Sequence, residues 1–556
     1  MCLFYLNIAD GLSQNQDPAT PIREYKERQE DPYIRVDRSD YRTSPAYYFH
    51  NEMITTYQVN VNAEGNNMLG DAANEPSIAI DPTNPQRMVI GWRQFDTVLS
   101  NFRQAGYGFT DDAGQTWSYP GVIEEGVFRS DPVLDFDKNG RFYYNSLGLY
   151  YRCDVFRTIN ETNWDKGTFA FGGDKQWMII DRTNSNSHGN IYALWKESLS
   201  NCDGGFTYSF DLGDSFETCD PLPRGFGRGT IATGPSGELF ACGELNGNIY
   251  IAKSTNTDKD KAPIEWEISK QVNLGGQFLP YIGPNPGGLL GQVWVAVDHS
   301  NGPDHGNVYL LSTLRIKSDS ADVMFARSTD GGKNWSEPVR INDDGSNHWN
   351  WFGTLSVAPN GRIDAAWLDS RDNPNSTYSA LYFSYSKDGG MTWAENIKLS
   401  EPFDPHAGYP NQSKLGDYFH MLSDEEGAHL AWAGTFNGEQ DVYYSRILVE
   451  EVTSTDALST LNNEKETDLV VFPNPFAEVT EITYSIQKPS FVSLEIVDLL
   501  GKRIRLLKSD YVEDGKHTVQ WDGTNDEGKI AGNGIYLCTM SSNHLPVQTK
   551  TLLLIK

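Results

Sequence analysis

Acidic, arginine and aromatic side chains stand at the ends of many predicted strands in this chain of 556 residues. These residue types can do carbohydrate chemistry, because paired carboxyl groups hydrolyse glycosidic bonds and arginines hold anionic groups bidentately. Aromatic side chains commonly line ligand sites and can stack on sugar rings. The candidates for general acid, general base or nucleophile are Asp131, Asp174, Glu197 and Tyr418. The candidates for substrate binding are Trp92, Arg93, Arg228, Asp369, Arg371 and Asp417.

These candidates extend from Trp92 to Tyr418, so a repeating fold has to bring them to one site. From about Asn74 one pattern recurs: an apolar run, a Gly/Asn/Asp turn, a second apolar run and two further strand-like runs. The first two runs of each copy span 75–92, 131–147, 176–195, 229–244, 292–312, 353–369 and 417–432. Sheets packed radially bury one another's faces and leave few exposed edges. The repeat therefore predicts an all-β fold with a seven-bladed β-propeller over 56–448, six blades being the alternative. A strand within 55–61 is expected to complete the last blade.

Four units carry a sharper motif at the end of their third strand. The segments 110–117, 209–216, 328–335 and 386–393 fit the pattern S/T-x-D-x-G-x-x-aromatic. The aspartate can accept hydrogen bonds from the N–H groups of a hairpin turn, and the glycine permits positive φ. The aromatic residue can pack between sheets. We therefore expect these aspartates to be structural rather than catalytic.

These motifs resemble the Asp-box (BNR repeat) family of sialidase-like β-propellers, and the resemblance covers about residues 74–447. It implies that the Asp boxes lie on the face opposite the ligand site. It also implies an arginine triad for a sialic carboxylate, a tyrosine nucleophile with a glutamate partner, and an aspartate as acid/base. By predicted face, these roles fall to Arg93, Arg228 and Arg371, to Tyr418 with Glu197, and to Asp131 or Asp174.

The chain departs from that family in two respects. The F/Y-R-I-P motif that carries the first arginine is absent, and that arginine stands in Gly91-Trp92-Arg93-Gln94. Sialidases of this type usually have six blades rather than seven. An exported glycan-processing enzyme, of the sialidase-like glycoside hydrolase class, is the leading hypothesis. A non-catalytic glycan- or protein-binding propeller, such as an adhesin, is its alternative, in which Arg371 merely pairs with Asp369 or Asp372.

Behind a polar linker at 449–467, the segment 468–556 has strand-like runs separated by Gly and Asn turns. Its motifs include Phe472-Pro473-Asn474-Pro475, Trp521-Asp522-Gly523 and Gly534-Ile535-Tyr536. The segment resembles the C-terminal sorting domain of type IX secretion cargo, and a plain immunoglobulin-like module is the alternative. The resemblance implies a small β-sandwich and the type IX machinery as a partner. It also implies a secreted protein, or one anchored on the outer surface of a Gram-negative bacterium.

Composition excludes several functions. The net charge of −30, from 75 acidic and 45 basic residues, would repel a phosphate backbone, so we expect no nucleic-acid partner. The six cysteines show no C-x-x-C spacing, so we expect no zinc site, no other metal and no cofactor. The sequence is compatible both with one or two disulfides and with free buried thiols.

The last expectations concern membrane spans, the N-terminal segment and the oligomeric state. No apolar stretch reaches the roughly 18 residues that a transmembrane helix needs. The segment 1–55 is interpreted as a signal remnant and a linker. We expect a monomer whose ligand is a glycan or glycoconjugate.

Overall fold

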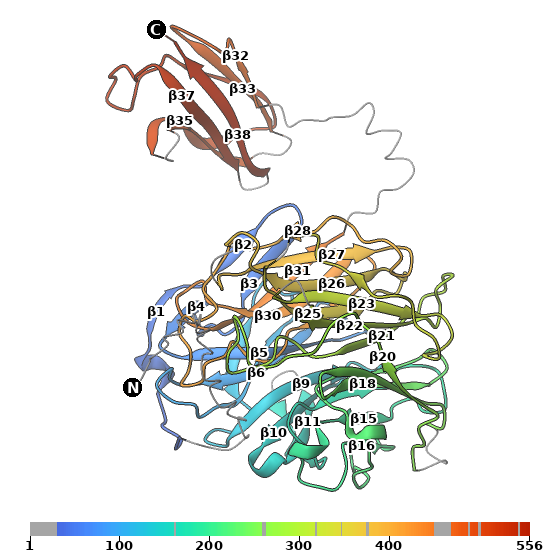
Figure 1. Ribbon diagram of the computed structural model, residues 1–556. Coiled ribbons are helices and arrows are strands. Elements are labelled where there is room, and N and C mark those ends of the chain that lie inside the picture. Colours follow the sequence, from blue (N-terminus) through green and yellow to red (C-terminus); the bar gives the residue numbers. More distant parts are fainter. Residues whose placement is uncertain are drawn as a thin grey trace, which may run out of the picture. The chain divides into compact units, whose positions relative to one another are not determined.

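The computed structural model describes residues 31–160, 163–257, 263–316, 320–345, 347–373, 377–449, 469–486, 490–498, 502–542 and 545–555. The chain divides into two compact units, one formed mainly by residues up to Leu448 and one by the residues from Val449 onward (Figure 1). Nearly all of the regular structure in both units is β-strand. The described part of the chain contains no helix that could span a membrane.

The first unit contains seven antiparallel sheets of three to five strands among its described residues, each made mostly from consecutive strands. The first is β5 (Ala72–Ile80), β6 (Met88–Phe95), β7 (Gln104–Thr110) and β8 (Ser118–Val122). The second is β9 (Arg129–Phe136), β10 (Phe142–Gly148) and β11 (Cys153–Asn160), with β12 (Asn163–Trp164) and β13 (Thr168–Phe169). The third is β14 (Trp177–Ile180), β15 (Ile191–Leu194) and β16 (Phe206–Ser209). The fourth is β17 (Ile231–Thr233), β18 (Leu239–Leu245), β19 (Asn248–Ser254) and β20 (Ile268–Val272).

The remaining sheets follow the same plan. The fifth is β21 (Trp294–Val297), β22 (Val308–Leu314), β23 (Asp322–Ser328) and β24 (Val339–Arg340). The sixth is β25 (Asn350–Val357), β26 (Ile363–Asp369), β27 (Ala380–Ser386) and β28 (Ile397–Lys398). The seventh is β29 (His420–Ser423), β30 (Gly427–Gly434) and β31 (Asp441–Leu448), extended by β3 (Ile54–Gln58) and β2 (Tyr48–His50). Four short 3-10 helices are η1 (Arg38–Asp40), η2 (Leu149–Tyr151), η3 (Glu197–Leu199) and η4 (Pro223–Gly225).

The seven sheets form a closed ring. The first strands of successive sheets contact one another in cyclic order, and β29 of the seventh sheet contacts β5 of the first. The ring is also closed by strand pairing between the two ends of the first unit, because β3 pairs with β31 and Ile54 lies opposite Ile447. The expected closing strand is therefore present. The segment interpreted as a linker through residue 55 contributes more than expected, since β2 joins the seventh sheet and β1 (Arg42–Pro45) pairs with β4 (Asn66–Leu69).

Each innermost strand is preceded or interrupted by one residue with positive φ. The φ values are 51° at Glu75, 43° at Asp131, 62° at Lys175, 58° at Arg228, 125° at Gly291, 57° at Phe352 and 109° at Gly416. The strand register shifts at Glu75, Asp131 and Phe352, so these residues lie in β-bulges. Such bulges re-aim a side chain at the end of a pairing. We call this end of the ring, where the inner strands begin, the bulge mouth.

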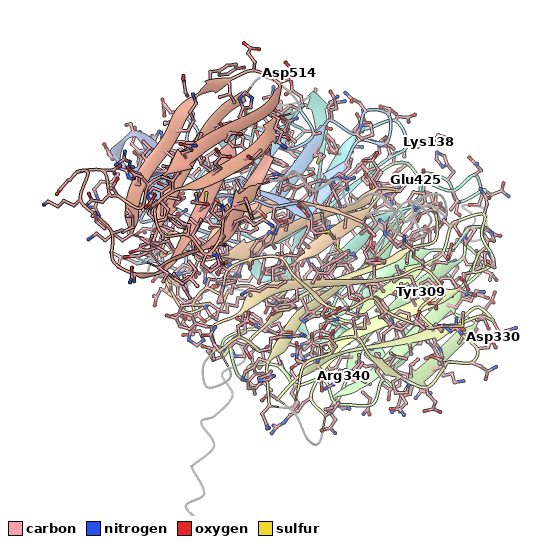
Figure 2. All side chains as sticks on the ribbon, turned by 90° about the horizontal axis from the view of Figure 1, so that it is seen from above. Lys138, Tyr309, Asp330, Arg340, Glu425 and Asp514 are labelled. Carbon is pink, nitrogen blue, oxygen red and sulfur yellow. A yellow bond between two sulfur atoms is a disulfide. The ribbon has the colours of Figure 1, made fainter. Side chains whose placement is uncertain are left out.

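The four motif hairpins have the predicted hydrogen bonds. Asp112 accepts from the backbone N–H groups of Gln115 and Thr116, both at 2.9 Å. Asp388 makes the equivalent bonds to Met391 and Thr392, at 3.0 and 2.9 Å. Asp211 and Asp330 each accept the N–H group four residues ahead, and all four glycines have positive φ. Figure 2 shows Asp330 at the edge of the molecule in that view.

These hairpins lie at the end of the ring where the inner strands finish. In the sixth sheet, Val357 at the end of β25 pairs with Ile363, which pairs with Ser386 at the start of a hairpin. In the fifth sheet, Val297 pairs with Val308, which pairs with Ser328. We call this end the hairpin mouth, and it is opposite to the bulge mouth.

The second unit is a two-sheet sandwich. One sheet has the order β32 (Val470–Phe472), β33 (Thr480–Ile486), β36 (Gly515–Trp521). The other has the order β35 (Arg503–Val512), β34 (Ser490–Val497), β37 (Gly534–Ser542), β38 (Leu545–Leu554). Trp521 lies in its core between the rings of Phe476 and Tyr536, at centroid distances of 5.4 and 5.3 Å. The unit thus has a hydrophobic core of its own.

Candidate functional site

The bulge mouth gathers most of the predicted acidic residues around one lysine. The Nζ atom of Lys175 lies 3.1 Å from Asp131, 3.0 Å from Asp174 and 2.7 Å from Asp417. A second lysine, Lys414, contacts Asp417 at 2.7 Å and Glu75 at 3.1 Å. The positive φ at Asp131 and Lys175 places both side chains on the axis, where consecutive sheets meet.

Arg93 adds a third cation to this cluster. Its Nε atom lies 3.1 Å from Glu75 and donates to the Oδ1 atom of Asn74 at 2.8 Å. The cluster therefore brings together three cations and four carboxyl groups from the first, second, third and seventh sheets. All of these side chains are buried. We call the group formed by Glu75, Arg93, Asp131, Asp174, Lys175, Lys414 and Asp417 the axial charge cluster.

The protonation of Glu75 can balance these charges. Burial raises the pKa of Glu75 to about 8, although Arg93 and Lys414 act in the opposite sense. Burial also opposes ionisation of Asp131 and Asp417, but Lys175 and Lys414 act together against it, and the pKa of both carboxyl groups lies below the usual range. With Glu75 protonated, three carboxylates face three cations, which is the arrangement that a buried cluster requires.

A loop seals the cluster from solvent. The connection between β20 and β21 reaches the seventh sheet, where the N–H group of Leu289 donates to Asp417 at 2.7 Å. Asn285 donates to the carbonyl of Gly416 at 2.8 Å and accepts from the N–H group of Leu415 at 3.0 Å. Asp131, Asp174 and Asp417 are thus buried as well as ion-paired in this structure.

The surroundings of Tyr418 differ from those of a nucleophilic tyrosine. It is buried, its hydroxyl donates to the carbonyl of Pro132 at 2.6 Å, and its ring packs on Trp177. Burial, together with the carboxyl groups of Glu75 and Asp131, raises its pKa well above 10. A nucleophilic hydroxyl needs the reverse, an adjacent base or a lowered pKa. Its expected partner Glu197 lies elsewhere, in η3, beside Gly225.

The three predicted arginines are each held by a different acid. Arg93 is bound in the axial charge cluster, whereas Arg228 pairs with Glu244 at 2.9 Å. Arg371 contacts Asp369 at 2.7 Å and Asp343 at 2.6 Å, and its guanidinium lies 4.4 Å from the ring centroid of Tyr382. The described contacts therefore do not assemble an anion-binding triad.

The other two binding candidates are also internal. Trp92 is buried between sheets, donates to the side chain of Gln94 at 2.7 Å and packs edge-on against Tyr119. Asp369 accepts from the indole of Trp367 at 3.1 Å as well as from Arg371. Both side chains support the sheet rather than face a mouth of the ring.

Sequence analysis did not select Lys414, which lies in a connection outside the repeating strands. Glu75, Asp131 and Lys175 all lie near the beginning of an inner strand, and that shared position is the signal in the sequence that groups them. Among the described residues, no cluster of His, Cys, Asp and Glu has the arrangement of a metal site. Lys175 itself occupies the centre of the carboxylates.

The axis also holds a cavity of about 430 Å³, on the other side of these residues. Its lining comes from β14, β17, β21, β25 and β29 and continues past the ends of these strands to Thr183, His299 and Pro359. Those last residues belong to the turns at the hairpin mouth. The cavity thus opens on the side of the motif hairpins, and the expected ligand site on the opposite face stays a prediction.

Comparison with known proteins shows only distant similarity. Residues 478–544 match the FlgD Ig-like domain family. A search of curated protein sequences found no significant match.

Solved structures with a similar course of the chain include three of different kinds. One is a protein of unknown function from Dyadobacter fermentans, with 15% identity, a TM-score of 0.42 and coverage of 72% of this chain and 100% of the other. Another is the BP39L lectin from Burkholderia pseudomallei, with 12% identity, a TM-score of 0.41 and coverage of 66% and 98%. A third is Trypanosoma rangeli sialidase in complex with the inhibitor DANA, with 10% identity, a TM-score of 0.35 and coverage of 89% and 86%. These similarities are too distant to indicate a function.

The raised pKa of Glu75 leads to a prediction about stability and pH. Because the folded-state pKa of about 8 lies above the ordinary value of 4.5, ionisation of Glu75 costs stability as the pH rises between these values. Glu75→Gln, which imitates the protonated carboxyl, should match the wild type near pH 5 and exceed its melting temperature at pH 9. Thermal unfolding followed by circular dichroism at both pH values checks this.

The exposed Glu64→Gln variant removes the same charge outside the cluster and is the matched control. It should follow the wild type at both pH values. If Glu75→Gln were less stable than the wild type at pH 9, the charge balance assigned to the cluster would be wrong.

Proposed function

We propose that this chain is an exported, non-catalytic glycan-binding protein built on a seven-bladed Asp-box β-propeller. The observation that carries the proposal is the contact of Lys175 with Asp131, Asp174 and Asp417. Most glycoside hydrolases need two carboxyl groups that reach the substrate, at roughly 5–5.5 Å or 6.5–9.5 Å from each other, and sialidase-like enzymes replace one of them with a tyrosine nucleophile. Here Asp131, Asp174 and Asp417 are buried and neutralised by the protein's own cations, and Glu197 lies apart from them in η3. Binding rather than hydrolysis is therefore the function that the geometry favours.

Two features support the propeller assignment. The seven sheets follow one another with inner strands in contact around a closed ring, which is the arrangement of blades. Four of these sheets end in hairpins with the Ser/Thr-Asp-Gly pattern and its hydrogen bonds. Asp-box repeats would produce these two features together.

A glycan is the ligand class that the cavity suits best. Two tryptophans, Trp177 and Trp294, line it together with hydroxyl groups from Thr230 and Thr233. Aromatic faces beside a few polar groups are the usual composition of small-ligand sites, and sugar rings offer both apolar faces and hydroxyl groups.

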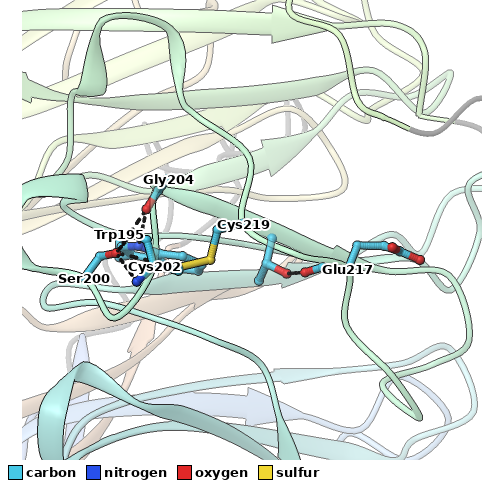
Figure 3. Close-up of a disulfide and its surroundings, with 7 residues drawn as sticks. Trp195, Ser200, Cys202, Gly204, Glu217 and Cys219 are labelled. Carbon is cyan, nitrogen blue, oxygen red and sulfur yellow. Dashed lines mark hydrogen bonds between the residues drawn. A yellow bond between two sulfur atoms is a disulfide. The ribbon is translucent and has the colours of Figure 1, made fainter.

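Export is supported by the second unit and by a disulfide. The unit is a sandwich of the immunoglobulin-like kind, and 468–556 carries the motifs that resemble a type IX sorting domain. Cys202 and Cys219 form a disulfide beside Trp195 (Figure 3). Disulfides persist in oxidising compartments outside the cytoplasm. We therefore place the protein outside the cell, free or on the outer surface, with the type IX machinery as its export partner.

The proposed absence of catalysis can be tested on the purified full chain. Incubation with a panel of fluorogenic glycosides, including a sialoside, should release no fluorophore above the buffer rate, because Asp131 and Asp174 are held in the axial charge cluster and Tyr418 is buried. A glycan array with the same preparation should show binding. Turnover that disappears in an Asp174→Asn variant would instead establish a hydrolase, and an array without binding would remove the glycan as ligand.

The export role can be tested by deleting residues 468–556. Because the sandwich has its own core, the remaining propeller should stay folded and protease-resistant. In a host with type IX machinery it should accumulate in the periplasm, whereas the full chain reaches the medium or the surface. Cell fractionation with immunoblotting measures this. Normal export of the shortened chain would refute the sorting role.

A further inference from the structure

The cavity at the hairpin mouth ends on a floor of three packed rings. The centroid of Trp177 lies 4.9 Å from that of Trp294 and 5.1 Å from that of His420. Trp294 and His420 are nearly parallel, with centroids 5.9 Å apart. Each residue is at least nine-tenths buried, and each lines the cavity. The floor therefore presents aromatic surface to whatever enters.

The same floor has hydrogen-bond donors without acceptors. The Nδ1 atom of His420 accepts from the backbone N–H group of Ile78 at 3.3 Å, so the ring proton sits on Nε2. Ser77 fits this assignment, since its hydroxyl accepts from Leu134 and lies 2.9 Å from the same Nδ1 atom. Among the described residues, the indole N–H groups of Trp177 and Trp294 have no hydrogen-bond partner.

Donors at the end of a cavity can bind an acceptor atom of a ligand that enters it. The imidazole offers no charge to that acceptor, because burial lowers the pKa of His420 to about 3 and keeps the ring neutral. The acceptor is thus expected to be an uncharged oxygen.

The wall and the rim of the cavity also favour an uncharged ligand. Ile179, Ala232, Ala296, Val357 and Leu422 line the cavity from five different sheets and are all apolar. At the rim, Arg182 lies 2.6 Å from Asp135, so its charge is already used within the protein. An anionic group would lose its hydration here without gaining a cation.

We propose that this cavity binds the terminal neutral pyranose of a glycan, with the sugar's apolar face on the indoles and its oxygens accepting from the three ring N–H groups. The volume of about 430 Å³ lies within the range of small-ligand sites. This proposal rests on the proposed glycan-binding function and specifies its site and its sugar class. It disfavours sialic acid, because the guanidinium of Arg182 at the rim is already paired with Asp135.

Two kinds of variant test the site. Trp177→Phe and Trp294→Phe each keep an aromatic ring but remove one N–H group, and each should weaken binding about fivefold, as expected for one neutral hydrogen bond. Trp393→Phe is the matched control, because it removes the same kind of indole N–H group from a residue that lies outside the cavity. Ala296→Leu fills the wall without removing any polar group and should abolish binding.

The measurement is isothermal titration of the full chain with methyl glycosides of glucose, galactose and mannose, and with the methyl glycoside of N-acetylneuraminic acid. At least one neutral glycoside should bind, and the sialoside should not. Circular dichroism of each variant confirms that it is folded. If Ala296→Leu is unfolded, the two Trp→Phe variants alone decide the proposal.

Each outcome separates this proposal from the function on which it rests. If glycans bind the wild type but Ala296→Leu and both Trp→Phe variants bind equally well, the site is wrong and glycan binding stands. If only the sialoside binds and Ala296→Leu abolishes it, the site stands and the neutral sugar class is wrong. If no glycoside or arrayed glycan binds, the proposed function fails and this proposal fails with it.

Discussion

The ion pairs of Lys175 are the interaction on which the rest of the structure depends. One ammonium group meets three carboxylates that arrive from the second, third and seventh sheets, and Lys414 and Arg93 extend the cluster to the first sheet. Sheets in a ring are held mainly by packing of their faces, which is not directional. A buried ion pair requires its two groups to lie in contact, because an unpaired ion in the interior is strongly destabilising. The cluster therefore constrains how these sheets meet at the axis.

This constraint also decides which end of the ring can receive a ligand. Asp131 and Lys175 both have positive φ at this end, and their side chains are engaged in ion pairs. The loop at Asn285 and Leu289 bonds to the same end of the seventh sheet. The opposite mouth has no such cluster among its described residues, and its cavity is lined by apolar and aromatic side chains. The axial charge cluster thus occupies one mouth of the ring, and the cavity opens at the other.

Some of this could be predicted from the sequence because it depends on neighbours in the chain. The hairpin at Asp112 is specified by residues within four positions, so its hydrogen bonds follow from the motif alone. Strand direction correctly grouped Asp131, Asp174 and Asp417 at one end. Depth could not be predicted in this way, because alternation along a strand does not say whether a polar residue faces solvent or another charge. For that reason the burial of Tyr418, Trp92 and Arg93 could not be predicted.

The cavity was missed for a related reason. Trp177, Trp294 and His420 belong to apolar runs in which an aromatic residue is ordinarily core, and only the closed ring shows that three of them meet around a hollow. The family resemblance directed attention to the bulge mouth, where the acidic residues are. Those residues proved to be fully engaged with Lys175 and its neighbours.

The most direct test of this account is the stability of Lys175→Met, compared with Lys138→Met in an exposed turn. Removing one partner of a buried ion pair typically costs about 3–5 kcal/mol. Chemical denaturation should show a loss of that size for Lys175→Met and almost none for Lys138→Met, with glycan affinity of the folded Lys175→Met protein unchanged. A Lys175→Met protein with wild-type stability and no glycan binding would contradict the account, because Lys175 would then belong to the ligand site.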